Sequence, residues 1–280
     1  MFSQDQRPLR AASSGAEPVL WRPREDEWEV VARGESGAVV RRCVDGSRYA
    51  KQVGPSDVAE LEAERDRLLW LRDAGVAVPQ VLEWNLAPDG GRVLVSSTLR
   101  GVPADTLDGR DLRAAWSSIV RAVRQLHDVD GGSCPFPAGV QQRFALAEDV
   151  VARDAVIVEF LPADQQGTRP QQLLDTLRTR RDRLIALEAG SAVMTHGDLT
   201  LANIMIDPEQ LSVTGFLDVG RAGIADRHVD LALLVETARE TWATAEDARE
   251  AGALLEEALG ITLDPERLRD YLHLDPLTWG

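Results

Sequence analysis

The chain has 280 residues, 44% of them apolar, which is enough for a packed core in one large domain or two lobes and excludes a disordered or fibrous chain. It carries 31 basic and 46 acidic residues, a formal net charge of −15, and residues 191–280 alone hold 17 Asp or Glu against 6 Arg. This sign argues against nucleic acid and anionic membranes as partners and favours a polycationic one.

Residues 1–20 are rich in Ser, Ala, Gln and Arg without periodicity, and we expect a flexible leader there. They lack the apolar stretch of a signal peptide, and no later run approaches the roughly 20 apolar residues that cross a bilayer. Only Cys43 and Cys134 could pair. We therefore expect a cytoplasmic protein with reduced thiols.

From Trp28 the sequence alternates short apolar runs with turn signals, which predicts consecutive antiparallel strands with Lys51 on the third. Residues 57–75 then place leucines at helical spacing and predict one helix. The apolar runs 78–84 and 91–99, separated by the turn APDGG, complete a five-stranded antiparallel sheet. We expect residues 21–99 to form one lobe.

After residue 100 the helical period dominates, and the sequence predicts helices at residues 109–128, 170–189, 228–243, 247–260 and 264–274. Residues 141–165 are weakly periodic and acidic. The apolar run 191–223 indicates a loop and two short strands joined by a turn at Asp207-Pro208. Residues 100–280 should thus form a mostly helical second lobe, and the fold class is α+β.

Lys51 is the only lysine among the 31 basic residues; the other 30 are Arg. Arg replaces Lys on most surfaces, but not where a compact ammonium must enter a tight site. Lys51 is therefore a candidate for a chemical role, with an ordinary surface lysine as the alternative.

The densest polar cluster is His196-Gly197-Asp198, followed by Asn203 and by Asp218 at the end of the second short strand. One carboxylate that accepts a hydroxyl proton, with an amide and a second carboxylate that hold Mg²⁺ against phosphates, suits phosphoryl transfer. Each element alone is weak, because an Asp in a loop is usually a turn former or a helix cap. Their joint occurrence favours the chemical interpretation.

The amino-terminal lobe adds a turn of small residues, a strand Lys and a helix Glu, the parts that handle ATP phosphates in kinases. With these, the sequence resembles the aminoglycoside phosphotransferase family, closest to the aminoglycoside 3′-phosphotransferases of the protein-kinase-like superfamily. The markers are ERDRLLWL, DAGVAVPQVL, QLHDVD, HGDLTLANIMID and GFLDVGRAGIADRHVDLAL. The resemblance runs from Trp28 to Asp275 and implies a two-lobed protein-kinase-like fold.

The resemblance implies a role for each matching residue. Asp198 would accept the substrate proton, Asn203 and Asp218 would hold Mg²⁺, and Lys51 would bridge the phosphates of ATP, with GTP as a second option. Glu64 would pair with Lys51, with Glu60 and Glu62 as alternatives, and His196 would support the loop rather than act as the base. The remaining nucleotide contacts would come from the turn at Ser36 and Gly37 and from hinge backbone at Ser97, Thr98 and Leu99.

Family substrates are polycations, so acidic residues are the candidate substrate ligands: Glu159, Asp164, Glu240 and Asp275. Each could equally be a solvated surface acid. The chain ends D-P-L-T-W-G, with Pro276 where the 3′-enzymes carry a second acid, and Glu236 replaces a frequent Arg. These departures indicate a rebuilt recognition surface.

The leading hypothesis is ATP-dependent O-phosphorylation that inactivates a polycationic antibiotic, most simply an aminoglycoside of the 3′ type. A tuberactinomycin peptide such as capreomycin or viomycin is the alternative substrate, and a small-metabolite kinase or a nucleotide-binding scaffold without turnover stands further behind. A protein kinase is disfavoured because the chain lacks a D-F-G and A-P-E pair. We expect a monomer or a weak dimer.

Overall fold

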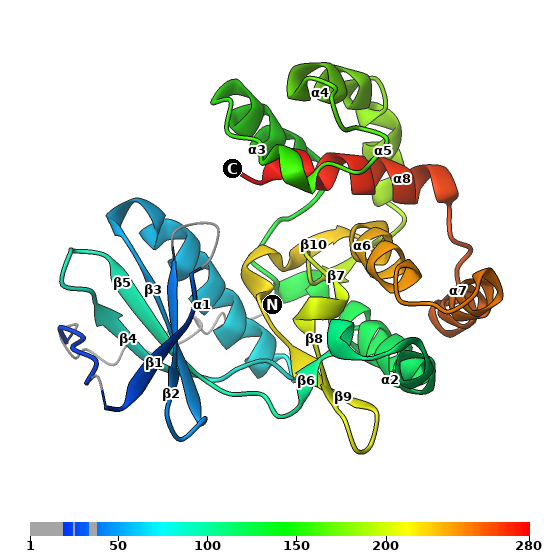
Figure 1. Cartoon of the computed structure of the whole chain (residues 1–280). Coiled ribbons are helices and arrows are strands. Elements are labelled where there is room, and N and C mark those ends of the chain that lie inside the picture. Colours follow the sequence, from blue (N-terminus) through cyan, green and yellow to red (C-terminus); the bar gives the residue numbers. More distant parts are fainter. Residues whose placement is uncertain (1–18, 25, 34–37) are drawn as a thin grey trace, which may run out of the picture.

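The computed structural model describes residues 19–24, 26–33 and 38–280, which form two lobes (Figure 1). The amino-terminal lobe holds an antiparallel five-stranded sheet in the order β1-β2-β3-β5-β4. Its strands are β1 (Trp28–Arg33), β2 (Val39–Cys43), β3 (Arg48–Val53), β4 (Val81–Leu86) and β5 (Arg92–Ser97). The predicted sheet is confirmed, with Lys51 on the third strand.

Helix α1 (Val58–Asp73) lies between this sheet and the other lobe (Figure 1). Strand residues alternate between the two faces of a sheet. Ala50 packs in a small cluster with Trp21 on one face, so its neighbour Lys51 points to the other, where Leu94 opposite it packs in the same core as α1. The alternation of β3 thus aims the single lysine at α1.

The expected leader falls mostly outside the described residues, but its last two residues are ordered. The N–H of Leu86 donates to the carbonyl of Val19 at 3.0 Å, and Leu20 bridges to Leu86. Trp21, which follows, is buried. The apolar run Val19-Leu20-Trp21 therefore pairs with the edge strand β4 instead of remaining part of the leader.

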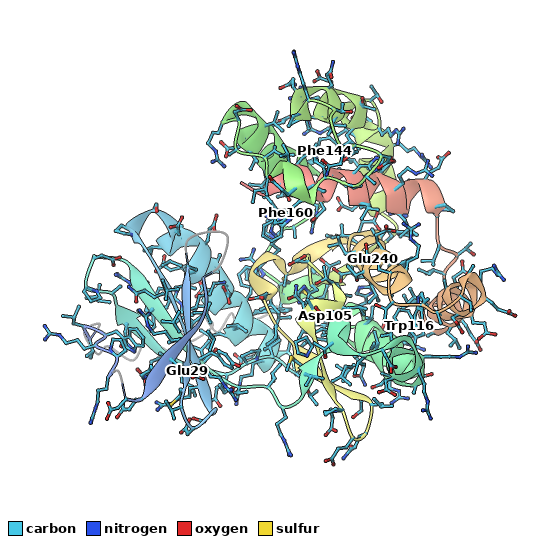
Figure 2. All side chains as sticks on the ribbon, viewed as in Figure 1. Glu29, Asp105, Trp116, Phe144, Phe160 and Glu240 are labelled. Atoms are coloured by element: carbon cyan, nitrogen blue, oxygen red, sulfur yellow. The ribbon has the colours of Figure 1, made fainter. Side chains whose placement is uncertain are left out.

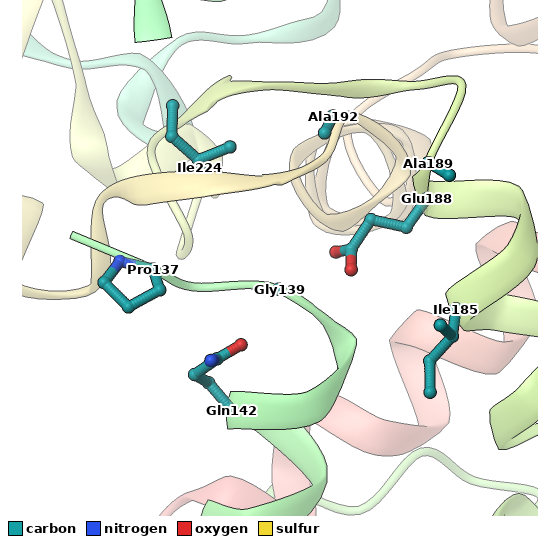
Figure 3. Close-up of a pocket in the computed structure, with 8 residues that line it drawn as sticks. All are labelled: Pro137, Gly139, Gln142, Ile185, Glu188, Ala189, Ala192 and Ile224. Atoms are coloured by element: carbon teal, nitrogen blue, oxygen red, sulfur yellow. The ribbon is translucent and has the colours of Figure 1, made fainter. Parts of the chain in front are cut away.

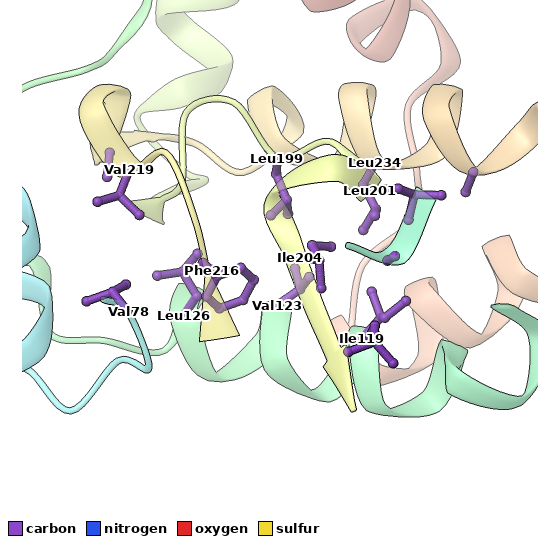
Figure 4. Close-up of a cluster of buried hydrophobic side chains, with 14 of the residues drawn as sticks. Val78, Ile119, Val123, Leu126, Leu199, Leu201, Ile204, Phe216, Val219 and Leu234 are labelled. Carbon is purple, nitrogen blue, oxygen red and sulfur yellow. The ribbon is translucent and has the colours of Figure 1, made fainter. Parts of the chain in front are cut away.

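The larger core continues from the amino-terminal lobe into the carboxyl-terminal lobe, where it lies between helices and short strands (Figure 4). Helix α2 (Gly109–His127), capped by Asp108, buries one face that includes Ile119, Val123 and Leu126. These side chains pack with Phe216 and its neighbours. The strands and helices are β6 (Val102–Pro103), β8 (Ile204–Asp207), β9 (Ser212–Phe216), α6 (His228–Arg239) and α7 (Ala245–Leu259).

A second core, which includes Phe144, Leu174 and Tyr271, joins the remaining helices. These are α3 (Val140–Ala152), α4 (Pro170–Arg178), α5 (Arg181–Glu188) and α8 (Pro265–Leu274). Helix α3 lies in the segment described as weakly periodic. The helix predicted over 170–189 is two helices, because the chain breaks at Thr179-Arg180 and Arg180 pairs with the buried Asp270 of α8.

Two strands flank the polar cluster and were not predicted: β7 (Ala192–Thr195) and β10 (Gly223–Asp226), which pair antiparallel. They hold the loop of Asp198 next to the segment that follows Asp218. Cys43 is buried, Cys134 is partly buried, and within the described chain neither forms a disulfide. In the described ranges no helix is both long enough and apolar enough to span a membrane.

Candidate active site

Asp198 lies in the loop between β7 and the turn Leu201–Asn203, and Asn203 fixes its carboxylate. The Asn203 side-chain N–H₂ donates to the Asp198 carbonyl at 2.8 Å and to Asp198 Oδ2 at 3.0 Å. Gly197 before it has φ +85°, and a Cβ there would lie 2.1 Å from the Arg221 carbonyl. Only glycine fits this close approach of the two loops.

His196 supports this loop from inside and is itself buried. Its Nε2–H donates to the Leu217 carbonyl at 2.7 Å, and its Nδ1 accepts from the Asp198 N–H at 3.3 Å. Burial lowers the pKa of His196, so the ring is neutral at pH 7. A ring with both nitrogens engaged by backbone suits the predicted supporting role and not that of a base.

Below the loop lies Asp230, which the sequence analysis did not single out. Its carboxylate accepts the N–H groups of His196 and Gly197 at 2.9 and 2.8 Å, and His127 Nε2 lies 3.0 Å away. Burial alone would raise the pKa of Asp230, but these hydrogen bonds and the imidazoles outweigh it and lower this pKa. The sequence signal that could have identified Asp230 is its position in the family marker HVDLAL.

Asp218 lies two residues beyond the end of β9 and has a left-handed conformation with φ 49°. The Leu217 N–H donates to the Asn203 carbonyl at 2.9 Å, which sets the two side chains at neighbouring loops. Since the Asn203 amide N–H₂ faces Asp198, its Oδ1 remains available as a ligand, and Asp218 is exposed.

These two ligands fit Mg²⁺, which is held by one or two carboxylates together with substrate phosphates and water. The described residues contain no cluster of three His, Cys, Asp or Glu side chains suited to a metal. Asn203 and Asp218 would therefore suit a Mg²⁺ ion whose remaining ligands come from substrate phosphates and water.

Lys51 and Glu64 meet across β3 and α1, with Lys51 Nζ 2.7 Å from Glu64 Oε2. Burial alone would lower the pKa of Lys51, but the charges of Glu64 and Asp218 outweigh it and raise this pKa. The ammonium is therefore permanently charged and lies near Asp218. Among the three acids considered on this helix, the structure pairs Glu64 with Lys51.

Helix α1 is tied directly to the other lobe. Arg67 Nε donates to the Ala222 carbonyl at 2.6 Å, and the guanidinium stacks on Phe136 at 4.6 Å. Ala222 lies in the segment that follows Asp218, so this contact fixes Glu64 and Lys51 relative to the loop of Asp218.

The expected hinge segment follows β5. The N–H groups of Ser97 and Thr98 already donate to the carbonyls of Gln80 and Ser47 at 2.9 and 3.0 Å. The Leu99 N–H donates to no backbone carbonyl of the described residues, and its contact with adenine stays a prediction. Ser36 and Gly37, expected above the phosphates, lie outside the described residues.

The candidate substrate ligand Asp275 lies beside Asp198. Burial, the largest effect, and the nearby Asp275 charge raise the pKa of Asp198 to about 7, while Arg221 and Asn203 oppose the shift. Arg143 on α3 contacts both the loop of Asp198 and Asp275. Its Nη2 donates to the Gly197 carbonyl at 2.9 Å, and its Nη1 lies 3.6 Å from Asp275 Oδ1. The sequence analysis missed Arg143 and Arg221.

The other three candidate substrate ligands are exposed. Glu240 lies at the end of α6 (Figure 2), Glu159 lies in the turn Val158–Phe160, and Asp164 Oδ2 lies 3.1 Å from His273 Nε2. Glu236 pairs with Arg239 on the same helix. These acids contribute charge to the surface of the lobe, and their contact with a substrate stays a prediction.

A cavity of about 350 Å³ lies elsewhere in the carboxyl-terminal lobe (Figure 3). Its lining residues are Pro137, Gly139, Gln142, Ile185, Glu188, Ala189, Ala192 and Ile224. Glu188 caps α3 there by accepting the Val140 N–H at 3.0 Å. None of the catalytic candidates lines this cavity, and its mostly apolar wall offers no phosphate ligands.

Comparison with known proteins gives a consistent result. The model of the phosphotransferase enzyme family matches residues 27–271. The chain is 53% identical to streptomycin 3''-kinase of Streptomyces griseus, over 91% of this chain and 93% of that protein. It is 32% identical to an aminoglycoside 3'-phosphotransferase of Streptomyces fradiae, over 89% and 94% of the two chains.

A solved structure of aminoglycoside phosphotransferase APH(3'')-Id from Streptomyces rimosus, in complex with ADP and streptomycin, superposes with a TM-score of 0.86. It is 46% identical, and the alignment covers 91% of this chain and 94% of that one. The match extends over both lobes, and the predicted two-lobed kinase-like fold is confirmed.

Proposed function

The chain belongs to the phosphotransferase enzyme family, and from this we propose that it transfers the terminal phosphoryl group of ATP to the 3''-hydroxyl of streptomycin or a close analogue. The activity of this chain is the phosphorylation of a hydroxyl group of an aminoglycoside. The 3'' position is favoured because similarity to the streptomycin 3''-kinase, at 53%, far exceeds the 32% to the 3' enzyme. The same similarity favours an aminoglycoside over a tuberactinomycin peptide.

One observation carries the chemistry: the Asp198 carboxylate is held by Asn203 at 3.0 Å, and the charge of Asp218 acts both on it and on the Lys51–Glu64 pair of the other lobe. The carboxylate proposed as proton acceptor and the ammonium proposed to bind phosphate thus both lie near Asp218. This is the arrangement that phosphoryl transfer requires.

Asp198 is the residue that would accept the proton of the substrate hydroxyl. With its pKa near 7, it is a stronger base than an ordinary carboxylate while remaining ionised at slightly alkaline pH. Asn203 orients the carboxylate, and His196 with Asp230 fixes the loop on which it stands. These contacts hold the acceptor in place before the substrate arrives.

Lys51 would donate to the phosphate oxygens of the nucleotide, and Glu64 keeps its ammonium in position. The Leu99 N–H would donate a hydrogen bond to the edge of the adenine ring. Asn203 and Asp218 would hold Mg²⁺, which when bound neutralises charge on the phosphates.

Substrate binding would rest on carboxylates. Streptomycin carries guanidinium groups, and charge-assisted hydrogen bonds from guanidinium to carboxylate are among the strongest available in proteins. Asp275, largely buried beside Asp198, is the best placed of the predicted acids.

The test is turnover of a compound panel by the purified protein with ATP and Mg²⁺. We expect ADP release with streptomycin and little with kanamycin, capreomycin or choline, and a product whose phosphate is located at the 3'' oxygen by ³¹P–¹H NMR. Phosphorylation of kanamycin without that of streptomycin would replace the 3'' assignment with a 3' one. Turnover of capreomycin or choline alone would refute the substrate class.

A further inference from the structure

The last turn of the chain returns to the active site. After α8, residues Asp275–Thr278 form a short turn in which Pro276, Leu277 and Thr278 are buried, and Trp279 follows. Gly280 then packs against Ala155 beyond α3. The tail is therefore a packed part of the lobe, and it carries Asp275 and Trp279 at its two ends.

Trp279 makes two contacts with residues of the site. Its Nε1–H donates to Asp275 Oδ2 at 3.0 Å. The Arg221 guanidinium lies 3.4 Å from the centre of its ring, which is a close cation–π stack. One side chain thus holds both a carboxylate and a cation next to Asp198.

Thr278 closes this set of contacts. Arg221 donates to Thr278 Oγ1 at 2.6 Å and to the Thr278 carbonyl at 2.8 Å, and the Thr278 hydroxyl donates to the Asp275 carbonyl at 2.6 Å. Arg221 is three residues beyond Asp218. The tail is therefore fastened to the metal-ligand loop, 57 residues away in the sequence.

The two oxygens of Asp275 differ as a result. Oδ2 is engaged by Trp279, whereas Oδ1 is buried and has no hydrogen-bond donor among the described residues. The nearest cation is Arg143, whose Nη1 forms an ion pair with Oδ1 at 3.6 Å, beyond hydrogen-bond distance, while its Nη2 donates to the Gly197 carbonyl. A buried carboxylate oxygen without a donor is costly, and it would gain a hydrogen bond from a cationic donor that a bound substrate brings within reach.

We propose, on the basis of the proposed function, that Trp279 is a positioning residue for the antibiotic: its indole N–H fixes one oxygen of Asp275 and turns the other toward a guanidinium or ammonium group of the substrate. The Arg221 stack holds the ring in the orientation that this requires. Trp279 thereby contributes to substrate affinity without contacting the nucleotide.

The test separates the indole N–H from the ring. Trp279→Phe keeps an aromatic surface for Arg221 and removes the donor, so KM for the antibiotic should rise about tenfold, the effect of losing a charge-assisted orientation of about 1.4 kcal/mol, while KM for ATP and kcat stay within about twofold. Trp279→Leu, which also removes the stack, should raise it further. Trp242→Phe is the matched control, because Trp242 packs on Trp116 and touches neither Asp275 nor Arg221.

A second measurement tests the route through Asp275. In the parent, Asp275→Asn should raise KM for the antibiotic strongly, but in the Trp279→Phe background it should add much less, because the two changes remove the same interaction. Full additivity, or a KM for Trp279→Phe no higher than for Trp242→Phe, would overturn the proposal.

The two proposals fail separately. Turnover of streptomycin by the parent decides the proposed function. The ratio of variant to parent KM, measured with whichever polycation the parent phosphorylates, decides the role of Trp279.

Discussion

The two sides of the active site are built in different ways. On the nucleotide side, Lys51 and Glu64 lie 13 residues apart and satisfy each other at 2.7 Å before any ligand binds. On the proposed antibiotic side, Asp275 keeps a buried oxygen without a hydrogen-bond donor among the described residues, and its partners come from α3, from the loop after β9 and from the tail. In the proposed function, phosphate binding would thus rest on a closed local pair, whereas substrate binding would rest on an open, long-range assembly.

This difference predicts how the two sides respond to change. Variants on the nucleotide side should affect every substrate alike, because all share the same phosphoryl donor. Variants on the antibiotic side should act on KM for the antibiotic and leave the nucleotide unaffected. The first prediction concerns Asp198, where both sides meet.

Asp198→Ala should cause the largest loss, on the order of 10²- to 10⁴-fold in kcat, because it removes the proton acceptor. Nucleotide binding should persist, since Lys51, Glu64 and Asp218 remain. Stopped assays for ADP give kcat, and calorimetric titration with a non-hydrolysable ATP analogue gives the affinity. Retention of more than a tenth of the parent kcat would exclude Asp198 as the base.

Lys51→Ala should lower kcat/KM for ATP on the order of 100-fold, because a positioned donor to the phosphates is lost and Glu64 is left buried and unpaired. Lys51→Arg should retain only part of the parent kcat/KM for ATP, since a guanidinium does not replace a compact ammonium at this position. The loss should be equal with any antibiotic that the enzyme accepts. A loss that depends on the antibiotic would contradict the separation of the two sides.

Asp275→Asn should raise KM for the antibiotic about 10- to 100-fold and leave KM for ATP within about twofold. The amide retains the shape of the side chain but loses the charge that faces the substrate. Initial rates with each substrate varied in turn measure the split. If KM for ATP rose in parallel, the residue would serve the nucleotide side as well.

The sequence predicted the nucleotide side better than the antibiotic side, for a physical reason. The alternation of β3 and the helical spacing of α1 are local signals that predict the two elements, and the resemblance to the family selected Glu64 as the partner of Lys51. Helix α3 was missed because Arg143 stands on its buried face and interrupts the apolar period. The same buried Arg143 is part of the site.

The tail shows the same limit. Trp279 and Arg221 stack only because α8 returns the chain to the loop after β9, and no local pattern announces that contact. Sequence analysis did identify Asp275 and the departure at Pro276, which mark the tail as altered. Which partners it acquires depends on tertiary packing alone.

The raised pKa of Asp198 makes a prediction about stability. Its folded pKa of about 7 exceeds the ordinary 3.8, so the folded state binds the proton more tightly than the unfolded state. This stabilisation is present below pH 4 and is lost as the pH rises to 7. Asp198→Asn should therefore increase the free energy of unfolding above pH 7 by about 2 kcal/mol, a value reduced from the full shift for partial contact with solvent.

Urea unfolding of the protein without metal or nucleotide at pH 8 and pH 4 measures this difference. The gain from Asp198→Asn should shrink toward zero at pH 4, where the parent carboxyl is protonated in the folded state. A variant less stable than the parent at pH 8 would show that the charge of Asp198 is not a burden on the fold. That result would contradict the interpretation that the Asp198 carboxylate lowers the stability of the fold in return for its proposed role as the base.

The smallest effects are expected from the exposed acids. Glu159→Gln, Asp164→Asn and Glu240→Gln should each raise KM for the antibiotic by no more than about twofold, because exposed charges contribute little and are screened by salt. Asp164 should give the least, since His273 already occupies its carboxylate.

Glu246→Gln on α7 is the matched control, an exposed acid of the same lobe. In low salt the three variants should differ from it slightly, and at 0.5 M NaCl the difference should vanish, which indicates long-range attraction of a polycation rather than contact. A tenfold rise in KM that persisted in high salt for any one of them would place that carboxylate against the antibiotic. The antibiotic side would then extend beyond Asp275, and its long-range assembly would be larger than the tail alone provides.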